Sequence, residues 1–151
     1  MRKLILPLLA SLAMASPALA NESRVEARGG VLWLPGQSEA TAGVAAGYDF
    51  DMGPAAFTGL EISADKALAS GYKTAFGFTG RAGIKAAVAK VYGAGGYTTE
   101  PCSNCNGAWH LGAGAEMPLM GPLYGKVEYR HLFGDKTFDS DALTAGVGIK
   151  F

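Results

Sequence analysis

Apolar side chains alternate with small or polar ones along most of the chain, which is the two-residue period of β-strands. In the last eleven residues, one row consists of Leu143, Ala145, Val147, Ile149 and Phe151. Turns marked by glycine and charge divide residues 21–151 into eight such segments, at 24–34, 41–52, 55–65, 72–86, 88–99, 107–117, 122–132 and 141–151. An even number of strands lets an antiparallel up-and-down sheet close on itself, so the pattern predicts an all-β, eight-stranded barrel.

Charged residues in these segments, apart from Asp141 at the start of the last one, keep to one face of each predicted strand. Those predicted to form a lumen network are Arg24, Glu26, Arg28, Asp49, Glu61, Arg81, Lys85, Lys90, Glu116, Lys126, Glu128, Arg130 and Lys150. The opposite rows, taken from Leu143 onward in the last segment, carry no Lys, Arg, Asp or Glu. A lipid-facing surface requires this, because an Arg or Lys at the bilayer midplane costs about 2–4 kcal/mol. We therefore predict a transmembrane barrel with apolar rows facing lipid and a charge network in the lumen.

The interior of an eight-stranded barrel is about wide enough for side chains to fill it. Inward charges should then pair and plug the lumen, since buried ions are tolerated only when they are paired. A narrow ion path through an imperfect network is the alternative. Small lumen residues favour that path because they leave volume unfilled; they are Gly43, Ala45, Gly47, Gly83, Ala94, Gly112, Gly114, Gly146 and Gly148.

Aromatic residues and loop lengths indicate an orientation. With both termini in the periplasm, one aromatic group lies near the external rim, namely Trp33, Tyr97, Trp109 and Tyr129. Tyr48, Phe50 and Phe151 then lie near the periplasmic rim. Two aromatic girdles match the two interfaces of a bilayer, although strand-forming aromatics in a soluble sandwich core are an alternative. The expected periplasmic turns, 52–54, 86–87 and 118–122, are shorter than three of the outer loops, 65–72, 99–107 and 131–141.

The N-terminal residues have the features of a secretory signal peptide. Arg2 and Lys3 precede a mostly apolar run that ends in the small-x-small sequence Ala18-Leu19-Ala20. We predict cleavage between Ala20 and Asn21, which gives a signal peptide at 1–20 and one barrel domain at 21–151. An uncleaved membrane anchor is the alternative, but the run is short for a spanning helix.

Composition and charge exclude several classes of protein. The 22 glycines and the few long aliphatic residues do not supply the dense core of a soluble globular domain. After the leader there is no apolar run long enough for a transmembrane helix. Removing residues 1–20 takes away two of the 13 basic residues and none of the 13 acidic ones, so the mature chain carries about −2. Nothing in this balance indicates a nucleic-acid partner.

Cys102 and Cys105 frame a Cys-Ser-Asn-Cys sequence in the third outer loop. In an exported protein a local disulfide is the favoured state. Free or redox-active thiols and a metal site are the alternatives, and a metal site would need further ligands. The nearest histidine, His110, is predicted to point into the lumen instead.

For catalysis the candidates are the two histidines, His110 and His131. Their potential companions are Ser103, Ser140, Asp139, Asp141 and Glu116. No spacing among them compels the hydrogen-bond contact that nucleophilic or acid–base catalysis needs. His131 beside an outer-loop acid would suit a lipid-modifying or proteolytic barrel, but an inert histidine is favoured. We predict no catalytic residue, no cofactor and no metal site.

Four segments carry a family resemblance: GYDFDMG (Gly47–Gly53), VYGAGGYT (Val91–Thr98), LYGKVEYRHL (Leu123–Leu132) and AGVGIKF (Ala145–Phe151). They resemble small eight-stranded outer-membrane β-barrels of the opacity-like porin family. The resemblance implies a place in the outer membrane of a Gram-negative bacterium, and the barrel-assembly machinery and periplasmic chaperones as transient partners. Val147, Ile149 and Phe151 match the pattern by which that machinery recognises its clients.

We therefore expect a monomeric, non-enzymatic barrel in contact with outer-membrane lipid, contributing to envelope integrity or surface interaction. The alternatives are a narrow porin-like channel for ions or small solutes, an envelope enzyme acting on lipid A or peptides, and a soluble lipocalin-like barrel. The last would place apolar residues inward and charges outward.

Overall fold

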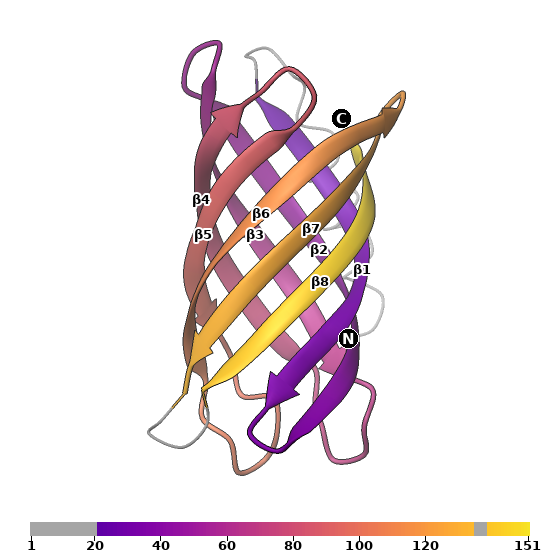
Figure 1. Cartoon of the computed structure of the whole chain (residues 1–151), viewed down its shortest axis with the longest axis vertical. Coiled ribbons are helices and arrows are strands. Elements are labelled where there is room, and N and C mark those ends of the chain that lie inside the picture. The colour runs from indigo at the N-terminus through magenta and orange to yellow at the C-terminus, as the bar shows by residue number, and fades with distance from the viewer. Residues whose placement is uncertain (1–20, 135–138) are drawn as a thin grey trace, which may run out of the picture.

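The structure, a computed structural model, describes residues 21–134 and 139–151, so the predicted signal peptide lies outside the described residues. The strands are β1 (Glu22–Leu34), β2 (Gln37–Asp51), β3 (Ala56–Ala67), β4 (Ala75–Lys85), β5 (Lys90–Thr98), β6 (Ala108–Met120), β7 (Leu123–Phe133) and β8 (Ser140–Lys150). Each pairs with the next in antiparallel fashion, and β8 closes the sheet on β1 (Figure 1). The predicted eight-stranded antiparallel up-and-down barrel is confirmed.

Several strand ends differ from the predicted segments. β2 begins at Gln37 rather than at residue 41, because Pro35 and Gly36 form a two-residue turn that pairs Leu34 with Gln37. Gly36 takes a φ of 84°, a backbone conformation that favours glycine. β6 continues to Met120 through a register shift after Pro118, which leaves only residues 121–122 as the turn. β4 starts later than predicted, at Ala75.

The two ends of the barrel differ in their connections (Figure 1). We call one the turn end, because it carries the short turns at 52–55, 86–89 and 121–122. The chain termini of the barrel also meet there, where Ser23 and Phe151 exchange two backbone hydrogen bonds of 3.0 Å. The opposite end, the loop end, carries the β1–β2 turn and the loops 68–74 and 99–107, and β7 ends and β8 begins there.

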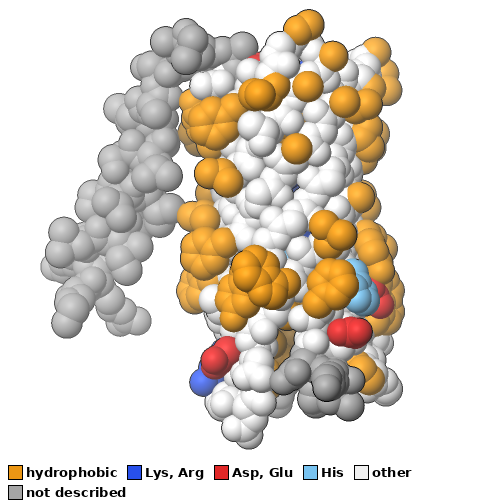
Figure 2. Space-filling model, turned by 90° about the vertical axis from the view of Figure 1, so that its left-hand side faces the viewer, with side chains coloured by type: hydrophobic (Ala, Val, Ile, Leu, Met, Phe, Trp, Pro, Cys, Tyr) orange, Lys and Arg blue, Asp and Glu red, His pale blue; other side chains and the backbone are white. Residues whose placement is uncertain are grey.

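The outer surface of the barrel is apolar. Leu60, Ile62 and Leu111 are 64%, 54% and 62% exposed, and Figure 2 shows hydrophobic side chains spread along the wall. Aromatic pairs mark both ends, with Tyr97 against Trp109 at the loop end and Tyr48 against Phe50 at the turn end. Apolar side chains outside and charged ones inside are the reverse of a soluble ligand-binding barrel, which argues against the lipocalin-like alternative.

No helix within residues 21–134 or 139–151 has the length and apolar character to cross a membrane.

Candidate functional site in the barrel lumen

The thirteen charged residues of the predicted lumen row all point inward. Lys85, Lys90 and Lys150, near the turn end, are half-buried. The other ten are buried, and they comprise the five cations Arg24, Arg28, Arg81, Lys126 and Arg130 and the five anions Glu26, Asp49, Glu61, Glu116 and Glu128. The buried charge is therefore balanced, which is the condition under which a barrel interior can hold so many ions.

Glu61 is the centre of this network. Its Oε1 accepts hydrogen bonds from Arg28 Nη1 at 3.0 Å and Arg130 Nη2 at 2.9 Å. Its Oε2 accepts one from Lys126 Nζ at 2.9 Å, and Arg24 Nη2 lies 3.0 Å from the same oxygen. The carboxylate projects from β3 and the four cations from β1 and β7, which are not its neighbours in the sheet. These ion pairs therefore span the lumen.

A second cluster lies around Arg81. Its Nε donates to Asp49 Oδ1 at 2.9 Å, and its Nη1 donates to Glu116 Oε2 at 3.0 Å. The guanidinium also lies over the ring of Tyr92, 4.8 Å from the centroid, and over that of Phe57 at 5.3 Å. Aromatic faces attract cations, so the two buried rings both fill the lumen and stabilise the charge.

Sequence reasoning missed several members of the network. Tyr92 Oη donates to Glu128 at 2.7 Å, and Tyr124 Oη donates to Glu26 at 2.8 Å. Asp65 accepts from Arg28, while Glu22 pairs with Lys90 and Lys150, and Asp51 pairs with Lys85. The signal was available, because Tyr92 and Tyr124 share the row of Lys90 and Lys126 on their strands.

The expectation that inward glycines leave the lumen unfilled is wrong. A methyl group added at Gly47 would overlap the Arg24 guanidinium, and one at Gly114 or Gly148 would overlap the ring of Tyr92 or Tyr124. Gly43 likewise lies against the carboxylate of Asp65, whereas a methyl group at Gly112 would overlap the backbone carbonyl of Tyr129. Glycines at such positions make room for long side chains from other strands. The small lumen residues, which were expected to favour an ion path, therefore allow these side chains to fill the lumen.

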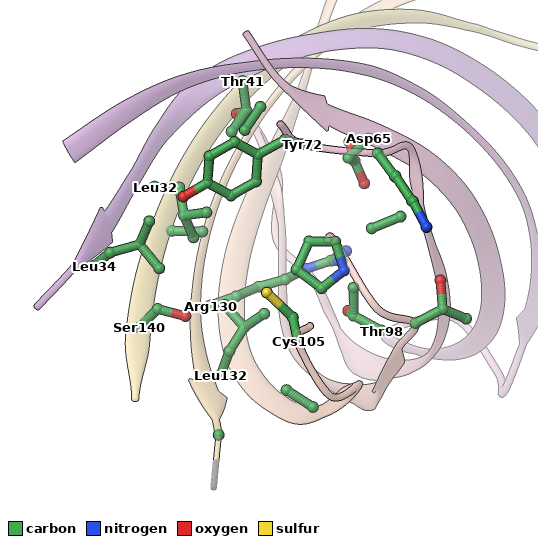
Figure 3. Close-up of a pocket in the computed structure, with 18 of the residues that line it drawn as sticks. Leu32, Leu34, Thr41, Asp65, Tyr72, Thr98, Cys105, Arg130, Leu132 and Ser140 are labelled. Carbon is green, nitrogen blue, oxygen red and sulfur yellow. The ribbon is translucent and has the colours of Figure 1, made fainter. Parts of the chain in front are cut away.

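A cavity of about 620 Å³ lies between the charge network and the loop end. Its floor includes Arg28, Asp65 and Arg130. Toward the rim the lumen row turns apolar, with Leu32 and Leu34 on β1 and Leu132 on β7 (Figure 3). Tyr72 and Lys73 from one loop and residues 101 and 104–106 from another also line it. We call this space the loop-end cavity.

The two cysteines join in a disulfide, Cys102–Cys105, within the loop at 99–107. Cys105 lines the loop-end cavity. The pair closes a four-residue segment of that loop, and among the described residues no group of three or more potential metal ligands occurs.

His110 points inward and is buried. Its two ring nitrogens lie 3.0 Å from the hydroxyls of Thr79 and Thr98, so both are occupied. The candidate companion Glu116 belongs to the charge network, and Ser140 is buried on the lumen side of β8. The structure brings none of the candidate acids or serines to this imidazole.

His131 and Asp141 meet on the outer surface near the loop end. His131 Nδ1 lies 2.8 Å from Asp141 Oδ1, and Tyr129 Oη donates to the same oxygen. Asp139 instead accepts from the backbone N–H of Gly134, and Ser103 lies exposed in the loop at 99–107. No hydroxyl of the described residues is hydrogen-bonded to His131, so among them the pair has no nucleophile of the kind that a hydrolytic triad needs.

The family model for the outer membrane protein beta-barrel domain matches residues 5–151. The chain belongs to this family. The predicted resemblance to small outer-membrane barrels is thereby confirmed. A search of curated protein sequences gives no significant match.

This outer-membrane barrel is similar to several solved structures. Against the N-terminal β-barrel domain of Pseudomonas aeruginosa OprF the identity is 16% over 86% of this chain and 97% of that one, with a TM-score of 0.62. Against the attachment invasion locus protein Ail of Yersinia pestis the identity is 11%, over 87% and 98%, with a TM-score of 0.60. Against the outer membrane enzyme PagL it is 13%, over 83% and 98%, with a TM-score of 0.55.

Identities this low show the shared fold alone. Since the same barrel occurs in an enzyme and in an attachment protein, the activity of this chain has to be argued from its own residues.

Proposed function

We propose that the protein is a closed, non-enzymatic barrel of the outer membrane of a Gram-negative bacterium, acting as a structural or surface-interaction protein. The observation that carries this proposal is the ion network centred on Glu61. Four cations from two other strands meet its carboxylate, and rings and guanidinium groups fill the space beside the glycines. A hydrated ion would have to displace paired, buried charges to pass, which costs several kcal/mol per ion.

The outer surface supports the membrane location. Its apolar wall suits hydrocarbon, and the aromatic pairs at both ends suit the two interfaces. We orient the loop end outward, because outer-membrane barrels have short periplasmic turns and longer external loops. The protein is then a monomer whose outer surface stays in contact with outer-membrane lipid. Periplasmic chaperones would deliver the chain to the barrel-assembly machinery. That machinery would recognise the exposed side chains of Val147, Ile149 and Phe151.

The surroundings of the two histidines favour a non-enzymatic role. His110 is held between two threonine hydroxyls inside the lumen, and His131 is held by Asp141 without a nucleophile among the described residues. An acyl-transfer or hydrolytic mechanism needs a nucleophile in hydrogen-bond contact with its base.

The test is a planar-bilayer recording of the purified, refolded protein. We expect no stable conductance, because the paired side chains of the network span the lumen. Recovery of a heat-modifiable band from the same membranes shows that the barrel was inserted. Stable conductance steps whose number rises with protein concentration would contradict the closed lumen and favour the porin-like alternative.

A further inference from the structure

We propose that the loop-end cavity binds a small amphipathic anion, with an apolar body against its leucine wall and a carboxylate or phosphate end at its cationic floor and rim. This inference goes beyond the proposed function, because it concerns the space above the charge network and holds whether or not that network conducts ions. It rests on three features of the cavity: its apolar wall, its fixed shape and its unused cationic donors.

The wall of the loop-end cavity is apolar, whereas the entrance of a water-filled channel would be lined by polar side chains. Leu32, Leu34 and Leu132 lie on lumen rows that are charged nearer the turn end, and each is only half-buried. Figure 3 shows them on one side of the cavity, facing Asp65 and Thr98 on the other. A concave apolar surface open to solvent is typical of a ligand site, and about 620 Å³ lies within the usual range for such sites.

The two loops that flank the cavity are held in place. The backbone N–H of Lys73 donates to the carbonyl of Pro101 at 2.7 Å, which joins the loop at 68–74 to that at 99–107. Gln37 Nε2 donates to Tyr72 Oη at 3.2 Å, and the disulfide closes the segment that contains Asn104. A cavity whose walls are already ordered binds at a lower entropic cost.

The charges in the cavity select the sign of the ligand. Asp65, the one acid among the described residues of its lining, accepts from Arg28 through both oxygens, and this bidentate pair compensates its negative charge. Arg130 uses Nε for Glu128 and Nη2 for Glu61, and its Nη1 has no hydrogen-bond partner among the described residues. Figure 3 shows this side chain extending toward the middle of the cavity.

Lys73 adds a second cation at the rim. It is exposed and lines the cavity, and it forms no ion pair with any residue of 21–134 or 139–151. Within the part of the chain that the structure describes, one guanidinium N–H at the floor and one ammonium at the rim are therefore without a partner, whereas the charge of the acid is compensated by Arg28. Charge-assisted hydrogen bonds from such donors favour a carboxylate or phosphate.

The experiment uses the refolded barrel in phosphatidylcholine nanodiscs, which avoids detergent micelles, and follows backbone amide signals by NMR. The probes are octanoate and octyl phosphate, with octanol as the uncharged match and acetate as the match without an apolar body. We expect both anions to shift signals of residues around the cavity, such as Thr98, Leu132 and Ser140, in a saturable manner. Octanol should bind at least about tenfold more weakly, since it lacks the charge-assisted hydrogen bonds, and acetate should not saturate.

The matched variants are Lys73→Glu and Lys66→Glu. Both reverse one exposed charge near the loop end, but Lys66 lies on the outward row of β3. We expect Lys73→Glu to weaken octanoate binding about tenfold or more, and Lys66→Glu to leave it unchanged.

Three results would overturn the proposal. The first is the absence of saturable shifts with either anion. The second is equal binding of octanol and octanoate, which would make the cavity a neutral apolar site. The third is an equal effect of the two variants, or shifts confined to outward-facing residues, which would indicate partitioning into lipid. None of these outcomes bears on the closed lumen, which the conductance recording tests separately.

Discussion

Replacement of Glu61 by Gln is expected to lower the free energy of unfolding by about 3–5 kcal/mol. The change keeps the size of the side chain but removes the one negative charge that, among residues 21–134 and 139–151, Arg24, Arg28, Lys126 and Arg130 all share. Removing one partner of a buried ion pair is costly because it leaves the other charge uncompensated. Here four buried cations lose part of their compensation at once.

The stability of the variant can be measured by urea unfolding of the barrel folded in phosphatidylcholine vesicles. Glu100→Gln is the matched control, because Glu100 is exposed in the loop at 99–107 and pairs with no cation among the described residues. We expect Glu100→Gln to change the free energy of unfolding by no more than about 0.5 kcal/mol. If Glu61→Gln proves as stable as Glu100→Gln, the ion pairs across the lumen do not hold the barrel together.

Replacement of Ile62 by Lys is expected to cost about 2–4 kcal/mol of folding free energy in a bilayer. Ile62 is 54% exposed in the middle of β3, on the row that faces away from the lumen. A lysine there would have to place its ammonium in hydrocarbon or bend it toward a distant headgroup. The expected result is a large fall in the yield of folded protein on refolding into vesicles.

Thr144→Lys provides the comparison. Thr144 lies on the lumen row of β8 and lines the loop-end cavity, where a lysine can extend into solvent-filled space. We expect its folded yield to stay close to that of the wild type, as judged by the fast-migrating band of an unheated gel. Equal losses in the two variants would mean that the outward and inward faces are assigned wrongly.

The sequence predicted the faces of the strands because a two-residue period is local. Arg24, Glu26 and Arg28 share a row whatever lies across the barrel, and the structure places that row inward. Two-residue turns are harder to anticipate, so the start of β2 at Gln37 was missed. Asp141 breaks the outward apolar row at its end, where Tyr129 and His131 provide hydrogen-bond partners.

Contacts across the lumen could not be predicted from the sequence. Alternation gives the side of a strand but neither its height nor the strand that faces it, so nothing identified Glu61 as the shared partner of four cations. For the same reason Gly47 and Gly114 were interpreted as empty volume, although Arg24 and Tyr92 fill it. The change from charge to leucine along the row of Arg130 and Leu132 was visible, and it marks the loop-end cavity.

The central claim is that the apolar side chains of this barrel face lipid and its charged side chains face one another. The most direct measurement compares refolding of the mature chain in the presence of phosphatidylcholine vesicles with refolding in plain buffer. We predict a heat-modifiable, vesicle-bound band that resists carbonate extraction, and aggregation when lipid and detergent are both absent. A folded, monodisperse protein in plain buffer would contradict the claim.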